Sequence, residues 1–365
     1  MYDWETMRMG EWEKERGEYH LLFPPSPSLP VIFVPSFYII NFTGSYFILE
    51  TTIIISQIFV LAIVVLIGAI AAKLKVMTLE SKDMLSKVIF NISLPMMLFT
   101  NFLKLEATPR LLTNSFVVLS VSGFVILFLL VAGWITTRIF KITGREAAVF
   151  KAHSMFGNTI FLGFPLINAL YGAEGLLYAT MFQLVSNIIM WTAGVVVLTY
   201  GNGISWKKSI LRVINPNTMA TLLGLSFFLL SLKIPKIIVT PLSELGAANT
   251  WLSMLYIGAM LVFSNVGGLL KKKSLYILSF NRLIFVPAIL VTLFALLSTL
   301  LGAAPDKLVS SVIILEASMP CMASVVIMAK ELGADDHLAV GNVFVSTILS
   351  IVTLPLVLMA INRFL

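Results

Sequence analysis

The chain has 365 residues, of which 58% are hydrophobic and 12% are charged, and its formal net charge is +7. Soluble globular proteins carry about 25% charged residues, so this composition excludes a soluble enzyme and a disordered chain. The apolar residues suffice for about ten helical spans of a bilayer. A single cysteine, Cys321, excludes an internal disulfide and a cysteine-based zinc site. The composition therefore predicts a polytopic protein of the cell membrane.

Residues 1–50 differ in composition from the rest of the chain. They are acidic and polar from Asp3 to Glu18, and five prolines then crowd residues 24–35. A signal peptide begins with a basic segment and a short apolar run, which this start lacks. Residues 31–49 are a weak candidate for an extra span. We expect residues 1–50 to be an N-terminal extension outside the core, either native or added by a wrongly chosen upstream start codon.

Ten largely uncharged runs follow this extension. Each approaches or exceeds the ~20 residues that a helix needs to cross ~30 Å of hydrocarbon. The runs are 51–72, 88–103, 111–137, 152–173, 175–200, 213–232, 245–270, 283–304, 308–329 and 338–361. They lack the alternation of period two that membrane strands show, so helices must satisfy the backbone. We expect an all-α membrane protein with ten transmembrane helices.

Basic residues are concentrated in alternate loops. The loops after odd-numbered runs hold sixteen Lys and Arg residues, whereas the loops after even-numbered runs and the C-terminal end hold six. Cytoplasmic loops of membrane proteins are enriched in Lys and Arg, so the odd-numbered loops are expected in the cytoplasm. The N- and C-termini of the ten-span core are then extracytoplasmic.

The two sets of five runs resemble copies of one unit. Ala-Leu-Tyr-Gly-Ala-Glu at 169–174 follows the fourth run, and Lys-Glu-Leu-Gly-Ala-Asp at 330–335 follows the ninth. Because a unit of five spans is odd, its two copies must cross the membrane in opposite orientations. We expect one repeat over residues 51–200, a short cytoplasmic loop over 201–216 and a second repeat over 217–365. Such inverted repeats are typical of secondary transporters.

Glycine and proline interrupt the fourth and ninth runs at matching depths. Asn158 lies between Gly157 and Thr159, and an offset of 161 residues places its counterpart beside Pro320, which precedes Cys321. Broken helices expose unpaired N–H groups and carbonyls, which can hold an anion and a cation. The alternative is that Gly and Pro are simply commoner in membrane helices. The matching positions favour a substrate site formed by Asn158, Thr159, Pro320 and Cys321.

Two further side chains are candidates for the site. Glu316 is a carboxylate deep in the ninth run, where a charge costs at least about 2.5 kcal/mol. It either couples transport to a proton or another cation, or is a neutral acid bonded to a neighbouring helix. Asn187 lies in the fifth run one turn from Gln183 and can contact substrate. We expect Arg282 to be an interfacial anchor and Trp191 to contribute packing.

Other chemistry has no motif in this sequence. There is no G-x-x-x-x-G-K-[ST] loop for ATP, no H-E-x-x-H and no G-x-S-x-G. Tracts for nucleic acid are absent as well. We therefore expect no enzymatic activity, no cofactor, no metal site and no nucleic-acid partner.

Several motifs together resemble one known family. Residues 157–166, followed by Ala-Leu-Tyr-Gly at 169–172, resemble the broken fourth helix of the auxin efflux carrier family. This family includes plant PIN-type carriers and bacterial malate and malonate permeases. Ile-Asn-Pro-Asn-Thr at 214–218 is similar to its Asn-Pro-Asn-Thr signature. Pro320 with 329–331 resembles its ninth helix, and Arg282 with 287–288 resembles its eighth.

The resemblance implies a 5+5 inverted-repeat carrier in which broken fourth and ninth helices cross and bind small organic anions. Position by position, it places Asn158 and Pro320 at the crossing. Plant members have proline where this chain has Gly157, which implies a looser first break. The short loop at 201–216 lacks the long insert of many plant carriers, so it favours a prokaryotic-type member.

These observations predict a secondary carrier that moves a small carboxylate by alternating access. Its expected partners are the organic anion, the lipid bilayer, a proton or sodium as coupling ion, and a second copy in a homodimer. One alternative is a sodium-coupled symporter like the bile-acid transporters, which share this architecture. A receptor or channel built on the same fold is another.

Overall fold

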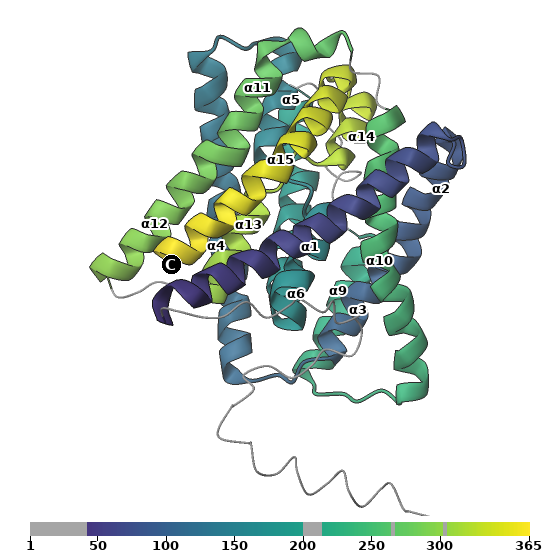
Figure 1. Cartoon of the computed structure of the whole chain (residues 1–365), viewed down its shortest axis with the longest axis vertical. Helices are drawn as coiled ribbons and strands as arrows, with labels where there is room; N and C mark the ends of the chain where they lie inside the picture. Colours follow the sequence, from purple (N-terminus) through teal and green to yellow (C-terminus); the bar gives the residue numbers. More distant parts are fainter. Residues whose placement is uncertain (1–41, 200–213, 264–266, 302–304) are drawn as a thin grey trace, which may run out of the picture. The chain divides into compact units, whose positions relative to one another are not determined.

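The computed structural model describes residues 42–199, 214–263, 267–301 and 305–365. Most of the extension predicted at 1–50, and most of the loop predicted at 201–216, lie outside these described residues. Within them the regular structure is helical, and one isolated antiparallel bridge joins two loops. The α-helices are α1 (Phe42–Lys73), α2 (Leu79–Val88), α3 (Leu94–Leu103), α4 (Pro109–Ile139), α5 (Gly144–Met155), α6 (Phe164–Ile189), α7 (Val195–Leu198), α9 (Pro216–Leu229), α10 (Lys236–Phe263), α11 (Lys273–Phe280), α12 (Val286–Leu301), α13 (Lys307–Ala317), α14 (Ala323–Glu331) and α15 (Asp336–Phe364) (Figure 1).

Six helical segments of the described chain are long and apolar enough to cross a membrane. They are Leu79–Leu103, Pro109–Ile139, Thr159–Leu198, Lys236–Phe263, Lys273–Thr299 and Asp336–Phe364. The six are fewer than the ten predicted runs for identifiable reasons. The ninth run is interrupted between α13 and α14, α9 has 14 residues, and parts of the fourth and fifth runs form one segment. The first run is represented by the shorter apolar stretch Phe59–Lys73 of α1.

Gly172 divides that long segment. Its φ of 62° and ψ of −151° are not helical, although hydrogen bonding continues on both sides. A positive φ is accessible to glycine without steric cost because glycine has no Cβ. The chain therefore changes direction close to the predicted end of the fourth run.

Wide π-helical turns precede three prolines. The turns are η1 (Ile89–Ser93), η2 (Thr159–Gly163) and η5 (Asn281–Phe285), and each ends two residues before a proline. The prolines are Pro95, Pro165 and Pro287. Proline lacks an N–H and its ring clashes with the carbonyl four residues earlier, so the preceding turn widens. A fourth π turn, η3 (Met190–Gly194), links α6 to α7.

The helices pack in two groups. In the first group, α2, α3, α9 and α10 pack against one another, and α1 joins them where Gly68 and Gly258 allow the α1 and α10 backbones to touch. In the second group, α4, α5, α6 and α13 pack together, and α15 runs along α11, α12 and α14 (Figure 1). Helix α6 and η2 also contact the first group, so the boundary between the groups passes beside the broken fourth run.

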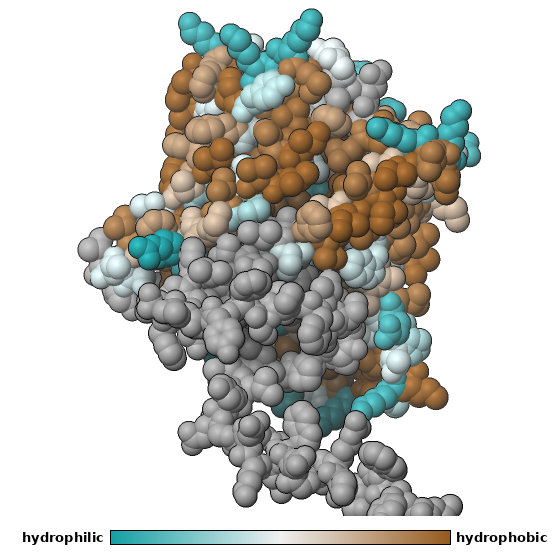
Figure 2. Space-filling model, viewed as in Figure 1, coloured by the Kyte–Doolittle hydropathy of each residue, from teal (hydrophilic) through white to brown (hydrophobic). Residues whose placement is uncertain are grey.

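The outer surface carries many large apolar side chains. Phe116 and Phe124 of α4 and Ile237 of α10 are each at least 70% exposed. Figure 2 shows hydrophobic residues over much of the coloured surface, with hydrophilic residues mainly toward the top, the upper right and the lower end of the view. Apolar patches of this extent are unfavourable in water, and they fit a chain that lies in lipid.

Candidate functional site

The two interrupted stretches of the chain pair with each other. Helix α5 ends at Met155 before η2, and α13 ends at Ala317 before α14. In the segments that follow these two helix ends, the Asn158 N–H donates to the Pro320 carbonyl over 2.7 Å. The Met322 N–H donates to the Phe156 carbonyl over 3.3 Å. Gly157 and Cys321 form the antiparallel bridge at the centre. We call residues 156–158 and 318–322 the crossing.

The Asn158 side chain is held in place because it caps the N-terminal end of η2. The Asn158 φ of −77° and ψ of 60° are outside the helical region, and its Oδ1 accepts from the Phe161 N–H over 3.3 Å. Its Nδ2 is buried and has no hydrogen-bond partner in the described part of the chain. Thr159 is buried as well, and its hydroxyl donates to the Gln183 Oε1. Asn158 therefore keeps one free donor, while Thr159 is occupied.

Cys321 and Glu316 are both fully buried. The Cys321 N–H donates to the Ser346 Oγ of α15 over 3.0 Å. Glu316 lies in the last turn of α13, and neither carboxylate oxygen has a hydrogen-bond partner among the described residues. A Cβ added at Gly163 would lie 3.0 Å from the Glu316 Oε2. Glycine at 163 is thus what lets the carboxylate approach η2.

Arg282 is buried at the crossing, which corrects the prediction that it anchors the chain at the membrane surface. Its Nε donates to the Met319 carbonyl over 2.6 Å, and its Nη1 donates to the carbonyls of His153 (2.9 Å) and Ser154 (2.5 Å). Its side chain is 1% exposed. Arg282 lies within the π turn η5 and is buried in the protein interior, whereas the hydropathy pattern alone suggests the end of a run at the membrane surface.

His153 connects three elements beneath the crossing. Its Nε2 lies 3.3 Å from the Met322 carbonyl, and its Nδ1 lies 3.2 Å from the Asn342 Nδ2 on α15. A carbonyl can only accept and an amide nitrogen can only donate. The imidazole is therefore neutral, with its proton on Nε2, and it holds α5, α14 and α15 together.

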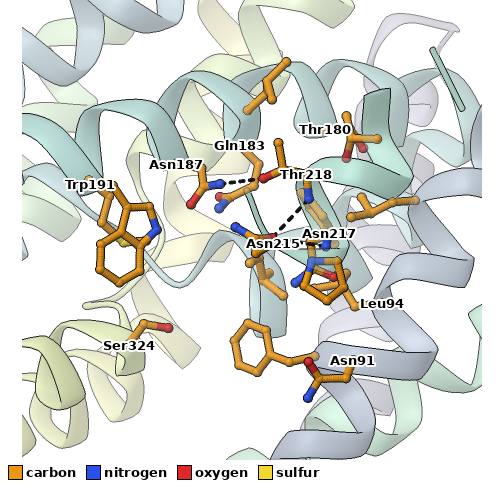
Figure 3. Close-up of a pocket in the computed structure, with 18 of the residues that line it drawn as sticks. Asn91, Leu94, Thr180, Gln183, Asn187, Trp191, Asn215, Asn217, Thr218 and Ser324 are labelled. Atoms are coloured by element: carbon orange, nitrogen blue, oxygen red, sulfur yellow. Dashed lines mark hydrogen bonds between the residues drawn. The ribbon is translucent and has the colours of Figure 1, made fainter. Parts of the chain in front are cut away.

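A cavity of about 480 Å³ lies beside the crossing, at the boundary between the two helix groups (Figure 3). The first group contributes side chains from η1, α3 and the start of α9, and the second contributes side chains from η2, α6, η3 and the start of α14. The polar lining residues are Asn91, Thr180, Gln183, Asn187, Asn215, Asn217, Thr218, Thr221 and Ser324. Phe90, Phe164 and Trp191 supply aromatic walls. The volume is in the range of small-molecule sites.

The start of α9 is built by the Asn-Pro-Asn-Thr motif. Asn215 caps the helix because its Oδ1 accepts from the N–H groups of Asn217 and Thr218, each over 3.1 Å. Pro216 occupies the first turn, where its missing N–H costs nothing. The Asn187 Nδ2 of α6 donates to the Thr218 Oγ1 over 2.8 Å (Figure 3). This bond joins the two helix groups across the cavity.

The cavity has a mainly apolar lining with several polar groups and no formal charge. None of the described residues that line it is Asp, Glu, Lys or Arg. Two helix N-termini, those of α9 and α14, contribute residues to its wall. The N-terminal end of a helix carries a partial positive charge, and side-chain amides offer N–H donors. The cavity can therefore receive a small anion that also has an apolar part.

The predicted site residues fall into two places. Asn158, Pro320 and Cys321 meet at the crossing, with Glu316 in the adjoining turn, whereas Asn187 lies in the cavity wall. Thr159 bonds Gln183 and so links the two places. Sequence reasoning assigned Trp191 to packing and did not predict Asn91, Ser324 or the α9 start as site residues, although all of them line the cavity. The Asn-Pro-Asn-Thr motif could have indicated the α9 part of the cavity wall, since it marks a capped helix start.

Comparisons with known proteins find membrane transport proteins. A family model described as membrane transport protein matches residues 53–205 and 202–358. An uncharacterized transporter of Methanothermobacter thermautotrophicus is 26% identical over 311 residues, covering 80% of this chain and 94% of that protein. An uncharacterized transporter of Methanocaldococcus jannaschii is 25% identical over 310 residues, covering 81% of this chain and 95% of that protein. Both matches extend over nearly the whole of these relatives.

Proposed function

From the premise that this chain belongs to the auxin efflux carrier family of membrane transport proteins, we propose that it is a secondary carrier for a small organic carboxylate. It is a multi-pass membrane protein. The proposed substrate site is the cavity between the two helix groups, and the crossing forms its supporting floor. The observation that carries this proposal is the cavity lining, which combines amides, hydroxyls and aromatic rings.

The lining favours a carboxylate for two reasons. Asn91, Gln183 and Asn187 bring amide groups to the wall, and the α9 and α14 N-termini add positive partial charge. No carboxylate among the described lining residues opposes an anion. The rings of Phe90 and Trp191 suit an apolar body attached to the carboxylate. A charge-assisted hydrogen bond is worth about 1.5–3 kcal/mol, so a few amides can offset much of the cost of desolvation.

We propose alternating access between the two helix groups. The cavity lies at their boundary, and each group supplies part of its wall. Movement of the second group, which holds both interrupted helices, against the first would open the cavity to one side and then the other. The first group would serve as the scaffold. Because a substrate would touch both groups, its binding can favour the closed arrangement between them.

The membrane arrangement belongs to the same proposal. Ten spans in two inverted repeats, over 51–200 and 217–365, would bring the two breaks to one depth, as the pairing of Gly157 with Cys321 requires. The cytoplasmic loops would be those that hold most Lys and Arg. Residues 1–50 would stand outside this core, whose ends face away from the cytoplasm. A homodimer would keep the scaffold groups fixed in the bilayer.

Glu316 is the proposed coupling group. Its carboxylate is buried beside η2 and has no hydrogen-bond partner in the described chain. It lies in the turn before the crossing, so its protonation would alter the field at the floor of the cavity. A carboxyl group in this position can take up a proton on one side of the membrane and release it on the other.

A counterflow assay tests the proposal. Purified protein is reconstituted in proteoliposomes that are preloaded with an unlabelled carboxylate, and uptake of the labelled compound is followed. A carrier accelerates labelled uptake when substrate is present on the far side, whereas a channel does not. The panel should contain dicarboxylates and indole acids. A thermal-shift screen with the same compounds identifies ligands first, since a bound ligand raises apparent stability. Absence of counterflow with every ligand that binds would refute the carrier assignment.

A further inference from the structure

Arg282 satisfies backbone carbonyls that the interrupted helices leave without partners. In a continuous helix the Ser154 carbonyl would accept from the Asn158 N–H, but that N–H donates to Pro320 across the crossing. The Arg282 Nη1 reaches Ser154 instead, and also bonds the carbonyl of His153. Its Nε bonds Met319, just after α13. One guanidinium thus binds the C-terminal ends of both broken helices.

Gly157 leaves space for the Arg282 guanidinium because it has no side chain. A Cβ added at Gly157 would overlap the Arg282 Nη2 and would come within 3.0 Å of the Met319 Cβ. Gly157 is also the residue that pairs with Cys321 at the centre of the crossing. A side chain at 157 is therefore incompatible with Arg282 in its observed place.

Arg282 is stabilised by carbonyl groups and not by an ion pair. Arg282 and Glu316 are the only Asp, Glu, Lys or Arg side chains that are fully buried in the described part of the chain. No ion pair within 4.0 Å joins them in that part. The cation faces the carbonyl ends of α5 and α13, which carry partial negative charge, and the carboxylate faces η2. Arg282 is therefore held by backbone carbonyls and not by direct contact with the Glu316 carboxylate.

Carbonyls at the C-terminal ends of broken helices are the groups that coordinate sodium in inverted-repeat carriers. Here three such carbonyls bind a guanidinium that is always charged and cannot leave. We infer that Arg282 is a built-in cation that occupies the position a coupling sodium ion would need, so that this protein works without sodium. The transport part of this inference rests on the proposed function. The inference argues against the alternative function of a sodium-coupled symporter.

The first test uses the wild-type protein and needs no transported substrate. Thermal unfolding is measured in detergent at matched ionic strength in sodium, potassium and choline chloride. We expect the same midpoint in all three salts because the carbonyls are already occupied. A midpoint raised by sodium alone would overturn the inference. This measurement stands even if no counterflow is found, so failure of the proposed function and failure of the inference remain distinguishable.

The second test replaces the built-in cation. We expect Arg282→Ala to unfold at a lower temperature than wild type and to lose counterflow. Millimolar guanidinium should raise its midpoint and restore part of the counterflow, because the free ion can fill the same carbonyl cage. Arg138→Ala is the matched control, since Arg138 is an exposed arginine that lies over Trp134. Neither this variant nor wild type should be stabilised by guanidinium.

Arg282→Lys keeps the inference testable if the alanine variant does not fold. Lysine retains the charge but lacks the planar fork that reaches three carbonyls, so we expect a folded protein with reduced counterflow in any of the three salts. Gly157→Ala should have the same effect because its Cβ displaces the guanidinium. Sodium-dependent uptake by wild type, or a folded Arg282→Ala that guanidinium neither stabilises nor reactivates, would show that Arg282 does not fill a cation site.

Discussion

The backbone N–H of Asn158 and the carbonyl of Pro320 are joined by a 2.7 Å hydrogen bond between stretches that are 162 residues apart in sequence. The bond exists because both helices stop there. Proline 320 cannot donate to a preceding turn, and Asn158 turns its side chain back to cap η2. The pairing makes the crossing a single unit, beside which lie the cavity and the two buried charged side chains.

Asn158→Ala and Pro320→Ala should each reduce counterflow strongly while folded protein remains in the membrane. The asparagine variant loses a cap worth about 1 kcal/mol and the free Nδ2 at the crossing. The proline variant restores an N–H that allows α13 to extend. Proteoliposome counterflow and size-exclusion profiles measure the two effects. Pro355→Ala in α15 is the control for a membrane-helix proline outside the crossing. Wild-type flux in both crossing variants would contradict this role.

Gly163→Ala should destabilise the protein and impair coupling. The new Cβ would lie 3.0 Å from Glu316 Oε2 and 3.2 Å from Oε1, so the carboxylate or η2 must move. Overpacking of this kind costs about 1–3 kcal/mol, which should appear as a lower thermal midpoint. Gly268→Ala is the control because no atom lies within 4 Å of a Cβ added there. Equal midpoints for the two variants would mean that Gly163 is not in tight contact.

Glu316→Gln should separate exchange from coupling. Glutamine preserves the shape of the side chain but cannot carry a proton. We expect the variant to bind substrate and to catalyse counterflow, yet to lose accumulation driven by an imposed pH gradient. Uptake into proteoliposomes with and without the gradient measures this difference. Glu244→Gln, on an exposed part of α10, is the matched control. A Glu316→Gln protein that responds to the gradient as wild type does would end the coupling proposal.

Substitutions at Asn187 should reveal the charge of the substrate. Asn187→Ala removes an amide from the cavity wall and its bond to Thr218, so we expect an apparent affinity weaker by roughly tenfold, since a hydrogen bond to a charged group is worth about 1.5–3 kcal/mol. Asn187→Asp should weaken it further because a carboxylate would repel an anion. Asn114→Ala, whose amide bonds Tyr178 away from the cavity, is the control. Tighter binding by Asn187→Asp would indicate a cationic substrate instead.

Several features of the protein could be read from local sequence. Long apolar runs predict membrane helices because the bilayer leaves the backbone no other partners. The positions of Asn158 and Pro320 predicted where two helices stop, since glycine and proline act on the turn in which they stand. Likewise, Ile-Asn-Pro-Asn-Thr marked a capped helix start before its surroundings were known. These properties depend on residues within one or two turns of each other.

The cavity and the position of Arg282 were decided by tertiary structure alone. The three carbonyls that hold Arg282 come from residues 37, 128 and 129 positions away. Local sequence patterns do not reveal contacts at such separations. The hydropathy of the sequence around Arg282 suggests a helix end at the membrane surface. The π turn η5 and the missing Cβ of Gly157 instead allow the Arg282 side chain to be buried. The cavity likewise joins residues of two helix groups, of which only Asn187 was expected. Sequence determined where each helix breaks, because that is a property of one chain segment. Packing decided what fills each break, because an unpaired carbonyl or amide binds whichever group the fold brings within reach.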